Sequence, residues 1–212
     1  MKRIAPLLLL LPAAPAWAHH PLAGQPMETF THALLSGIGH PVLGFDHLFF
    51  VLAVGLATML AGLPRIGPLA FIAAMLVGCG AQYAGLGFAL REPVIALSLL
   101  VVGGVLASGR APAPTALIAL FAGFGLFHGA AFASSIAAQE GGVSAIVLTG
   151  YLIGLGGVQY LLARLAGRIG AHTLQSGPSG AVPVQMVGAA VAGVGLFLCL
   201  EALEAQLLAL LL

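Results

Sequence analysis

Three side chains that can bind metals or move protons stand within eight residues of one another. His40, Asp46 and His47 lie in the stretch HPVLGFDH, directly before a run of apolar residues. Two imidazoles and a carboxylate form a mixed nitrogen and oxygen donor set, which suits Ni(II), Co(II), Zn(II) or Cu(II) better than magnesium or calcium. A helix cap beside an interfacial histidine is the alternative, but it does not explain three such groups so close together. The stretch therefore predicts a site for a divalent transition metal.

A further imidazole, His128, stands in a second apolar run beside glycine and alanine. Ionisable side chains inside membrane helices usually face the bundle interior and mark an ion pathway. Taken alone, this histidine is also explained as a hydrogen-bonded core residue. Its depth favours the pathway, because His47 and His128 lie at similar depths when counted at about 1.5 Å per residue from the outer ends of their helices. We predict that His40, Asp46, His47 and His128 form the metal site.

The spacing of His40 and His47 leaves two arrangements open. On a straight helix, residues seven apart share a face but lie about 10 Å apart along the axis, which is long for one coordination shell. Either Pro41 and Gly44 distort the start of the helix, or the two histidines are successive stops on the path of an ion, and we favour the second. Pro41 suits the first turn of a helix, which would place Asp46 about one and a half turns inside.

Other titratable residues form weaker candidates. His19 and His20 would begin the mature chain, where a free amine and adjacent imidazoles can chelate a divalent metal, and His32 follows. The alternative for this group is an exposed polar tail. His172 is expected in an inside loop, and Glu201 and Glu204 are expected either at the membrane interface or in ion capture.

These residues are rare in a very apolar chain. Of 212 residues, 60% are hydrophobic and 6% are charged, whereas soluble domains carry about 25% charge. This number of charges is too small to cover a water-facing surface. Lipid must therefore cover most of the protein surface. The formal net charge is +1 and no basic patch occurs, which argues against nucleic acid as a partner. The two cysteines stand in apolar runs and are expected to be packing residues.

The apolar runs predict an all-α membrane protein, a bundle of six transmembrane helices after a cleavable signal peptide. Residues 1–18 are typical of that signal, with two basic residues, an apolar core and the cleavage motif AWA; an uncleaved anchor is the alternative. Residues 19–40 are expected to form a periplasmic N-terminal segment, and residues 41–212 the transmembrane domain. The spans are expected at 42–62, 67–90, 93–109, 114–137, 143–163 and 184–211.

The arginines orient these spans independently. With the N-terminus outside, the inside loops hold four arginines and the outside loops hold Arg91 alone. This distribution agrees with the positive-inside rule. We therefore expect a multi-pass protein of the bacterial inner membrane whose mature N-terminus is periplasmic. The inside arginines are Arg65, Arg110, Arg164 and Arg168.

Small residues predict close contacts between the helices. Gly125 and Gly129 have the spacing GxxxG, as do Gly150 and Gly154. The second predicted span holds a further set of glycines that fit close helix contact. These are Gly78, Gly80, Gly85 and Gly87.

The two histidine motifs resemble those of the HupE/UreJ family of membrane proteins. The pattern H-P-x-x-G-x-D-H is matched from His40 to His47, and the pattern F-H-G-x-A is matched around His128. The second motif then departs from the family pattern, because Phe132 replaces Val or Tyr and Ser135 stands where Glu is expected.

The resemblance implies uptake of nickel or cobalt for the maturation of urease or hydrogenase, with the metallochaperones of those enzymes as partners. It implies that His40, Asp46, His47 and His128 matter for this uptake. The metal is then the cargo, no permanent cofactor is expected, and the chain is not expected to be an enzyme. No G-x-x-x-x-G-K-[ST] motif occurs, so the chain itself is not expected to use ATP. We expect a secondary permease.

The residues themselves leave three other functions open. The first is a membrane haem protein or electron carrier with His47 and His128 as axial ligands. The second is a metal-binding accessory protein that does not transport. The third is an intramembrane hydrolase, although no G-x-S-x-G motif occurs.

Overall fold

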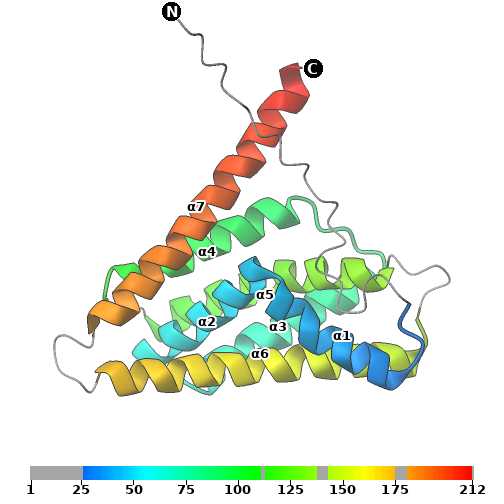
Figure 1. The fold of residues 1–212 in the computed structure, drawn as a ribbon, viewed down its shortest axis with the longest axis horizontal. Coiled ribbons are helices and arrows are strands. Elements are labelled where there is room, and N and C mark those ends of the chain that lie inside the picture. The colour runs from blue at the N-terminus through cyan, green and yellow to red at the C-terminus, as the bar shows by residue number, and fades with distance from the viewer. Residues whose placement is uncertain (1–25, 111–112, 138–142, 175–180, 212) are drawn as a thin grey trace, which may run out of the picture.

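The computed structural model describes residues 26–110, 113–137, 143–174 and 181–211. Within these ranges all regular structure is helical, in seven helices (Figure 1). The predicted all-α class is confirmed. The helices are α1 Phe30–Leu43, α2 Phe45–Leu60, α3 Ile66–Tyr83, α4 Arg91–Ala107, α5 Pro114–Ala137, α6 Ala145–Leu174 and α7 Ala181–Leu211.

Four of these helices, α3, α5, α6 and α7, are long and apolar enough to cross a membrane. The bent pair of α1 and α2 makes a fifth crossing if it counts as one span. α4 has 17 residues, fewer than the roughly 20 that a transmembrane helix needs. The described residues therefore have the helices of a multi-pass membrane protein, without reaching the predicted six spans. The predicted signal peptide lies outside the described residues.

The predicted first span, 42–62, is wrong as a continuous helix. α1 and α2 meet at Gly44 and are bent by 82°. Gly44 has φ −82° and ψ 101°, an extended conformation that ends α1, yet its N–H still donates to the His40 carbonyl at 3.0 Å. Pro41 lies inside α1 near its end and not in a first turn, and Asp46 is in the first turn of α2. Because of this break, His40 and His47 do not lie on one straight helix, as the sequence analysis assumed.

The ends of the later helices agree with the predicted spans in part. α5 has the predicted bounds, 114–137. α3 ends at Tyr83, and the chain turns away at Gly85, whose φ of +90° favours glycine. α6 continues to Leu174, so most of the expected inside loop is helical, and His172 is exposed in the last turn of this helix.

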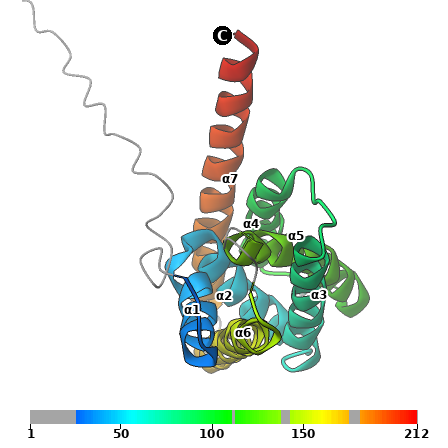
Figure 2. The same ribbon diagram turned by 90° about the vertical axis from the view of Figure 1, so that its right-hand side faces the viewer.

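The helices pack mainly in three pairs: α3 with α5, α4 with α7, and α1 with α6. Figures 1 and 2 both show α1 lying along α6, while the C-terminal half of α7 extends beyond the other helices. α2 lies among these pairs and contacts α6 and α4 most. Its buried residues are His47 and every position from Phe50 to Thr58 except Leu52. This central helix carries two of the predicted site residues at its start.

Glycines allow the closest of these contacts. A Cβ added at Gly129 would collide with the Met75 carbonyl oxygen on α3, and one at Gly150 would lie 2.6 Å from the Phe30 carbonyl oxygen on α1. The predicted close contacts are confirmed at Gly78, Gly125, Gly129, Gly150 and Gly154. They are wrong at Gly80, Gly85 and Gly87, where an added Cβ would have nothing within 4 Å.

Candidate metal site

Two predicted site residues meet in the centre of the bundle. His47 on α2 and His128 on α5 are 7% and 1% exposed, and their Nδ1 atoms lie 2.9 Å apart, within hydrogen-bond distance. The ring centroids are 5.1 Å apart. The similar depths that the sequence predicts for these two histidines agree with this contact.

A serine on α4 determines which His128 nitrogen carries a proton. The Ser98 hydroxyl donates to the Ile95 carbonyl oxygen at 2.6 Å, and its only proton is used in this bond. His128 Nε2 lies 2.9 Å from Ser98 Oγ, so Nε2 must be the donor there. Nδ1 of a neutral His128 is then an acceptor, and His47 Nδ1 donates to it.

This network leaves His47 Nε2 as the nitrogen that faces a carboxylate. Nε2 lies 3.9 Å from Asp46 Oδ2. When Nδ1 carries the proton of a neutral imidazole, Nε2 presents a lone pair, which a nearby carboxylate repels. A metal ion bound between the two atoms would remove this repulsion. The pair is therefore arranged to favour a positive charge.

His40 has a comparable hydrogen-bonded partner. Tyr151 on α6 is completely buried, and its hydroxyl donates to the Phe132 carbonyl oxygen at 3.1 Å. His40 Nδ1 lies 2.9 Å from the same hydroxyl, which accepts from it. The bend between α1 and α2 places the centroids of His40 and His47 6.2 Å apart. Of the two arrangements left open by the sequence, the structure has the distorted start of the helix. The successive stops that we favoured stay a prediction.

The hydrogen bonds distinguish the roles of the three histidines. Proteins orient a metal-binding imidazole by bonding its second ring nitrogen to another group, and His40 and His47 each have such a bond at Nδ1. Both nitrogens of His128 have protein partners. In this structure His128 therefore positions His47. Ser98 and Tyr151, which complete the network, are absent from the sequence prediction.

Aromatic side chains form the wall of the site. Phe132 is completely buried, and its ring centroid lies 5.1 Å from that of His40 and 4.2 Å from that of His47. Phe50 is stacked on His128 at 4.3 Å. The departure from the family pattern at Phe132 thus lies in direct contact with both imidazoles.

An acidic cleft begins at Asp46. It has a volume of about 220 Å³ and is also lined by Glu92 of α4 and Glu201 of α7. The Asp46 side chain is 29% exposed, so it lies between the cleft and His47. Glu201 lines the same cleft as Asp46, and its role in ion capture stays a prediction. Glu92 is missed by the sequence prediction, because a carboxylate in the first turn of a helix is common.

The other candidates are not brought to this site. His32 is exposed in the first turn of α1, where its backbone N–H donates to Thr29 Oγ1 at 3.1 Å. His19 and His20 lie outside the described residues. Cys79 and Cys199 are free thiols. Over the ranges that the structure describes, no three side chains of His, Cys, Asp and Glu are already placed to hold one metal ion together.

Comparison with known proteins covers most of the chain. The model of the family described as HupE / UreJ protein matches residues 7–198. Protein HupE of Rhizobium leguminosarum bv. viciae is 31% identical over 164 residues, which are 76% of this chain and 81% of that protein. No solved structure matches the chain.

Proposed function

Because this chain belongs to the HupE/UreJ family, we propose that it carries a divalent transition metal, nickel or cobalt, inward across the bacterial inner membrane. The resemblance drawn from the two histidine motifs is confirmed by this membership. The family is associated with nickel and cobalt uptake for hydrogenase and urease. Its members are transporter-type accessory proteins and not known enzymes.

The observation that carries the proposal is the placement of His47 Nε2, which lies 3.9 Å from the Asp46 carboxylate while Nδ1 is bonded to the buried His128. We propose the His40 imidazole as the third donor. Two imidazoles that share an ion keep their ring centres roughly 4.5–6.5 Å apart, since metal–nitrogen bonds are about 2.0–2.1 Å long. The 6.2 Å between His40 and His47 falls in this range, so rotation of the side chains would complete the ligand set without moving the helices.

The charges around this ligand set suit a transported ion. The acidic cleft with Glu92 and Glu201 attracts a dication toward Asp46. Inside, one carboxylate offsets only half of the dication's charge, so binding is weak enough for release. The C-terminal end of α1, which holds His40, adds partial negative charge. Helices that break near a substrate are a recurring feature of secondary transporters.

Two further steps complete the proposed transport, one on each side of the membrane. His19, His20 and His32 collect the ion on the periplasmic side. Movement of the helices then opens the site toward the cytoplasm, where metallochaperones of urease or hydrogenase maturation receive the metal.

The geometry supports a metal ion better than the alternative of a haem. His47 and His128 are bonded directly to each other, and Phe50 is stacked on the second ring, so no slot for a macrocycle separates them. The hydrolase alternative has no support among the described side chains, and those of Ser134 and Ser135 lie outside them. An accessory protein that binds metal without transporting it is distinguished by the measurement of cobalt entry into liposomes.

Accumulation of radioactive nickel or cobalt by cells tests the proposal. We expect His47→Ala and His40→Ala to reduce accumulation at least tenfold, because each removes a metal ligand, and His128→Ala to reduce it by disordering His47. The matched control is His172→Ala, which removes an exposed imidazole from the end of α6 and should leave accumulation unchanged. Normal accumulation by the His47→Ala and His40→Ala variants, at normal levels in the membrane, would contradict the site.

Purified protein in liposomes separates transport from binding. Wild type should move cobalt into the lumen, and the His47→Ala variant should not. Cobalt that binds to wild-type protein without entering the lumen would favour the accessory protein over the permease.

A further inference from the structure

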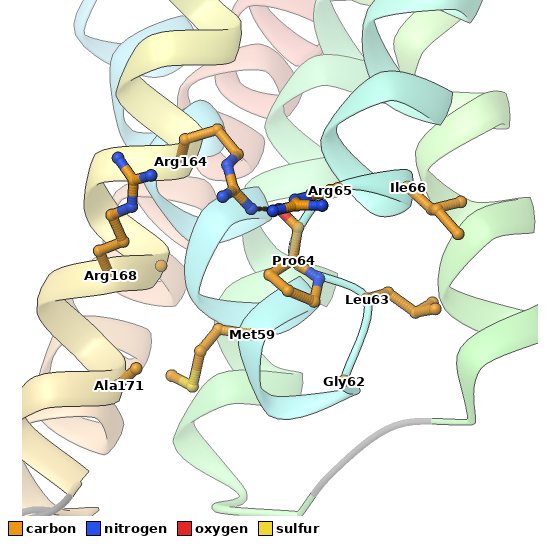
Figure 3. A pocket seen from close by; sticks show the side chains of 10 residues that line it. Met59, Gly62, Leu63, Pro64, Arg65, Ile66, Arg164, Arg168 and Ala171 are labelled. Carbon is orange, nitrogen blue, oxygen red and sulfur yellow. Dashed lines mark hydrogen bonds between the residues drawn. The ribbon is translucent and has the colours of Figure 1, made fainter.

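Three arginines line one cleft at the opposite end of α2 from the metal site. The cleft has a volume of about 570 Å³ and lies between α6 and the turn that joins α2 to α3 (Figure 3). Arg164 and Arg168 reach it from α6, and Arg65 reaches it from the turn. Arg164 and Arg168 are four residues apart on one helix, so they lie on the same helix face.

One of these arginines is held in place by the main chain. Arg164 Nη1 donates to the carbonyl oxygen of Pro64, and Figure 3 shows this bond crossing from α6 to the turn. The bond orders the guanidinium but does not neutralise it. A guanidinium has five N–H donors in a fixed fork, so further donors of Arg164 are left for a ligand.

Among the described residues, none supplies a counter-charge to the positive charge of the cleft. No carboxylate lines it. Over the ranges that the structure describes, the ion pairs are His47 with Asp46 and Arg91 with Glu92. Three guanidinium groups that share a cleft without a carboxylate repel one another and attract an anion.

We propose that this cleft binds a phosphate-bearing anion, either the headgroup of an anionic phospholipid or a soluble phosphate. Planar guanidinium forks match phosphate oxygens in two-point hydrogen bonds. The volume lies within the roughly 300–1,000 Å³ of small-molecule sites. Apolar side chains of Met59, Leu63 and Ile66 also line the cleft, and basic clefts between helices on the cytoplasmic side are typical of sites for anionic lipid headgroups.

The cleft is independent of the proposed metal pathway. Met59 is thirteen residues after Asp46 in α2, which corresponds to about 20 Å along the helix. Three guanidinium groups also repel a dication, so metal is not expected to pass through this cleft. A failure of the uptake experiments would therefore leave the anion site unaffected.

Native mass spectrometry of the full chain in detergent tests the proposal. Phosphatidylglycerol and phosphatidylethanolamine are added in equal amounts, and we expect wild type to retain the anionic lipid at least fivefold better. Arg164→Gln combined with Arg168→Gln should lower this retention at least fivefold. The matched control is Arg110→Gln, which removes an arginine predicted on the same membrane side but outside the cleft. Gel filtration checks that each variant is folded, and Arg65→Gln serves as the second variant if the double variant is not.

A second arm separates the two sources of phosphate. Inorganic phosphate at millimolar concentration is added without lipid, and thermal unfolding is measured. A stabilisation of wild type that the double variant lacks, without retention of phosphatidylglycerol, would assign the cleft to a soluble phosphate. The proposal is overturned if wild type shows neither effect, or if Arg110→Gln weakens binding as much as the cleft variants do.

Discussion

His47 and His128, which are 81 positions apart in the chain, share a hydrogen bond of 2.9 Å between their Nδ1 atoms. One of the two nitrogens must donate and the other must accept. Ser98 Oγ accepts a hydrogen bond from His128 Nε2–H. His128 Nδ1 is therefore the acceptor, His47 Nδ1 is the donor, and the lone pair of His47 Nε2 faces Asp46. Residues that do not touch the metal are therefore expected to change how it is bound.

Ser98→Ala should weaken metal uptake although serine is not a proposed ligand. The substitution leaves the buried His128 Nε2–H without an acceptor, which costs about 1–3 kcal/mol. Rotation of the His128 ring would pair this N–H again but would break the hydrogen bond with His47. We expect the KM for uptake to rise about five- to tenfold, measured in cells with matched expression.

Two variants control the Ser98 prediction. Ser98→Thr keeps the hydroxyl and should restore most of the uptake. Ser108→Ala removes a hydroxyl that bonds a carbonyl three residues earlier in the same way, at 2.7 Å from the Val105 oxygen, but in an exposed position. Equal losses for Ser98→Ala and Ser108→Ala would contradict the role assigned to Ser98.

Tyr151→Phe should affect the site through His40. The ring and its packing remain, but His40 Nδ1 loses the hydroxyl that lies 2.9 Å away. Orientation of His40 is then less fixed, so we expect weaker cobalt binding by the purified protein, with a several-fold higher Kd. Tyr160→Phe, which alters a partly buried tyrosine on the same helix, is the matched control. A Kd unchanged by Tyr151→Phe would show that His40 does not need this partner.

Gly129→Ala should destabilise the pair of α3 and α5. The new methyl group would collide with the Met75 carbonyl oxygen. Relieving this collision requires a shift of the α3 main chain, which costs more free energy than rotation of a side chain. Overpacking of this kind costs about 1–3 kcal/mol, which should lower the unfolding temperature in detergent. Gly123→Ala on the same helix meets nothing within 4 Å and should leave that temperature unchanged. Similar unfolding temperatures for the two variants would argue against the close contact.

Acidification should release the metal from the purified protein. The bond between His47 and His128 needs one acceptor nitrogen, and protonation of both rings converts both Nδ1 atoms to donors. Protonation also occupies the Nε2 atoms that bind the ion. We expect cobalt binding to fall progressively as the pH is lowered through the acidic range in which imidazoles become charged. Binding measured in detergent avoids the effect of pH on a transport gradient, and affinity that is constant from pH 8 to pH 5 would contradict histidine ligands.

The sequence alone was sufficient to single out the histidines and the aspartate of the proposed site. Ionisable groups are costly in an apolar helix, so His47 and His128 are conspicuous in their surroundings. Apolar length likewise gave the bounds of α5, and the GxxxG spacing predicted close contact at Gly129 and Gly154. The prediction at Gly80 rested on its small size alone, which permits a close neighbour without requiring one, and an added Cβ there would meet nothing within 4 Å.

Only the tertiary structure decided how the site is assembled. Ser98 is inconspicuous in the sequence because a serine hydroxyl can donate a hydrogen bond to a main-chain carbonyl of its own helix. Its contact with His128 depends on how α4 packs beside α5. The bend at Gly44 is likewise a property of packing, since glycine permits an extended conformation without requiring one. Local pattern determined which residues are chemically able to hold a metal, whereas contacts between distant helices determined which nitrogen atoms face it.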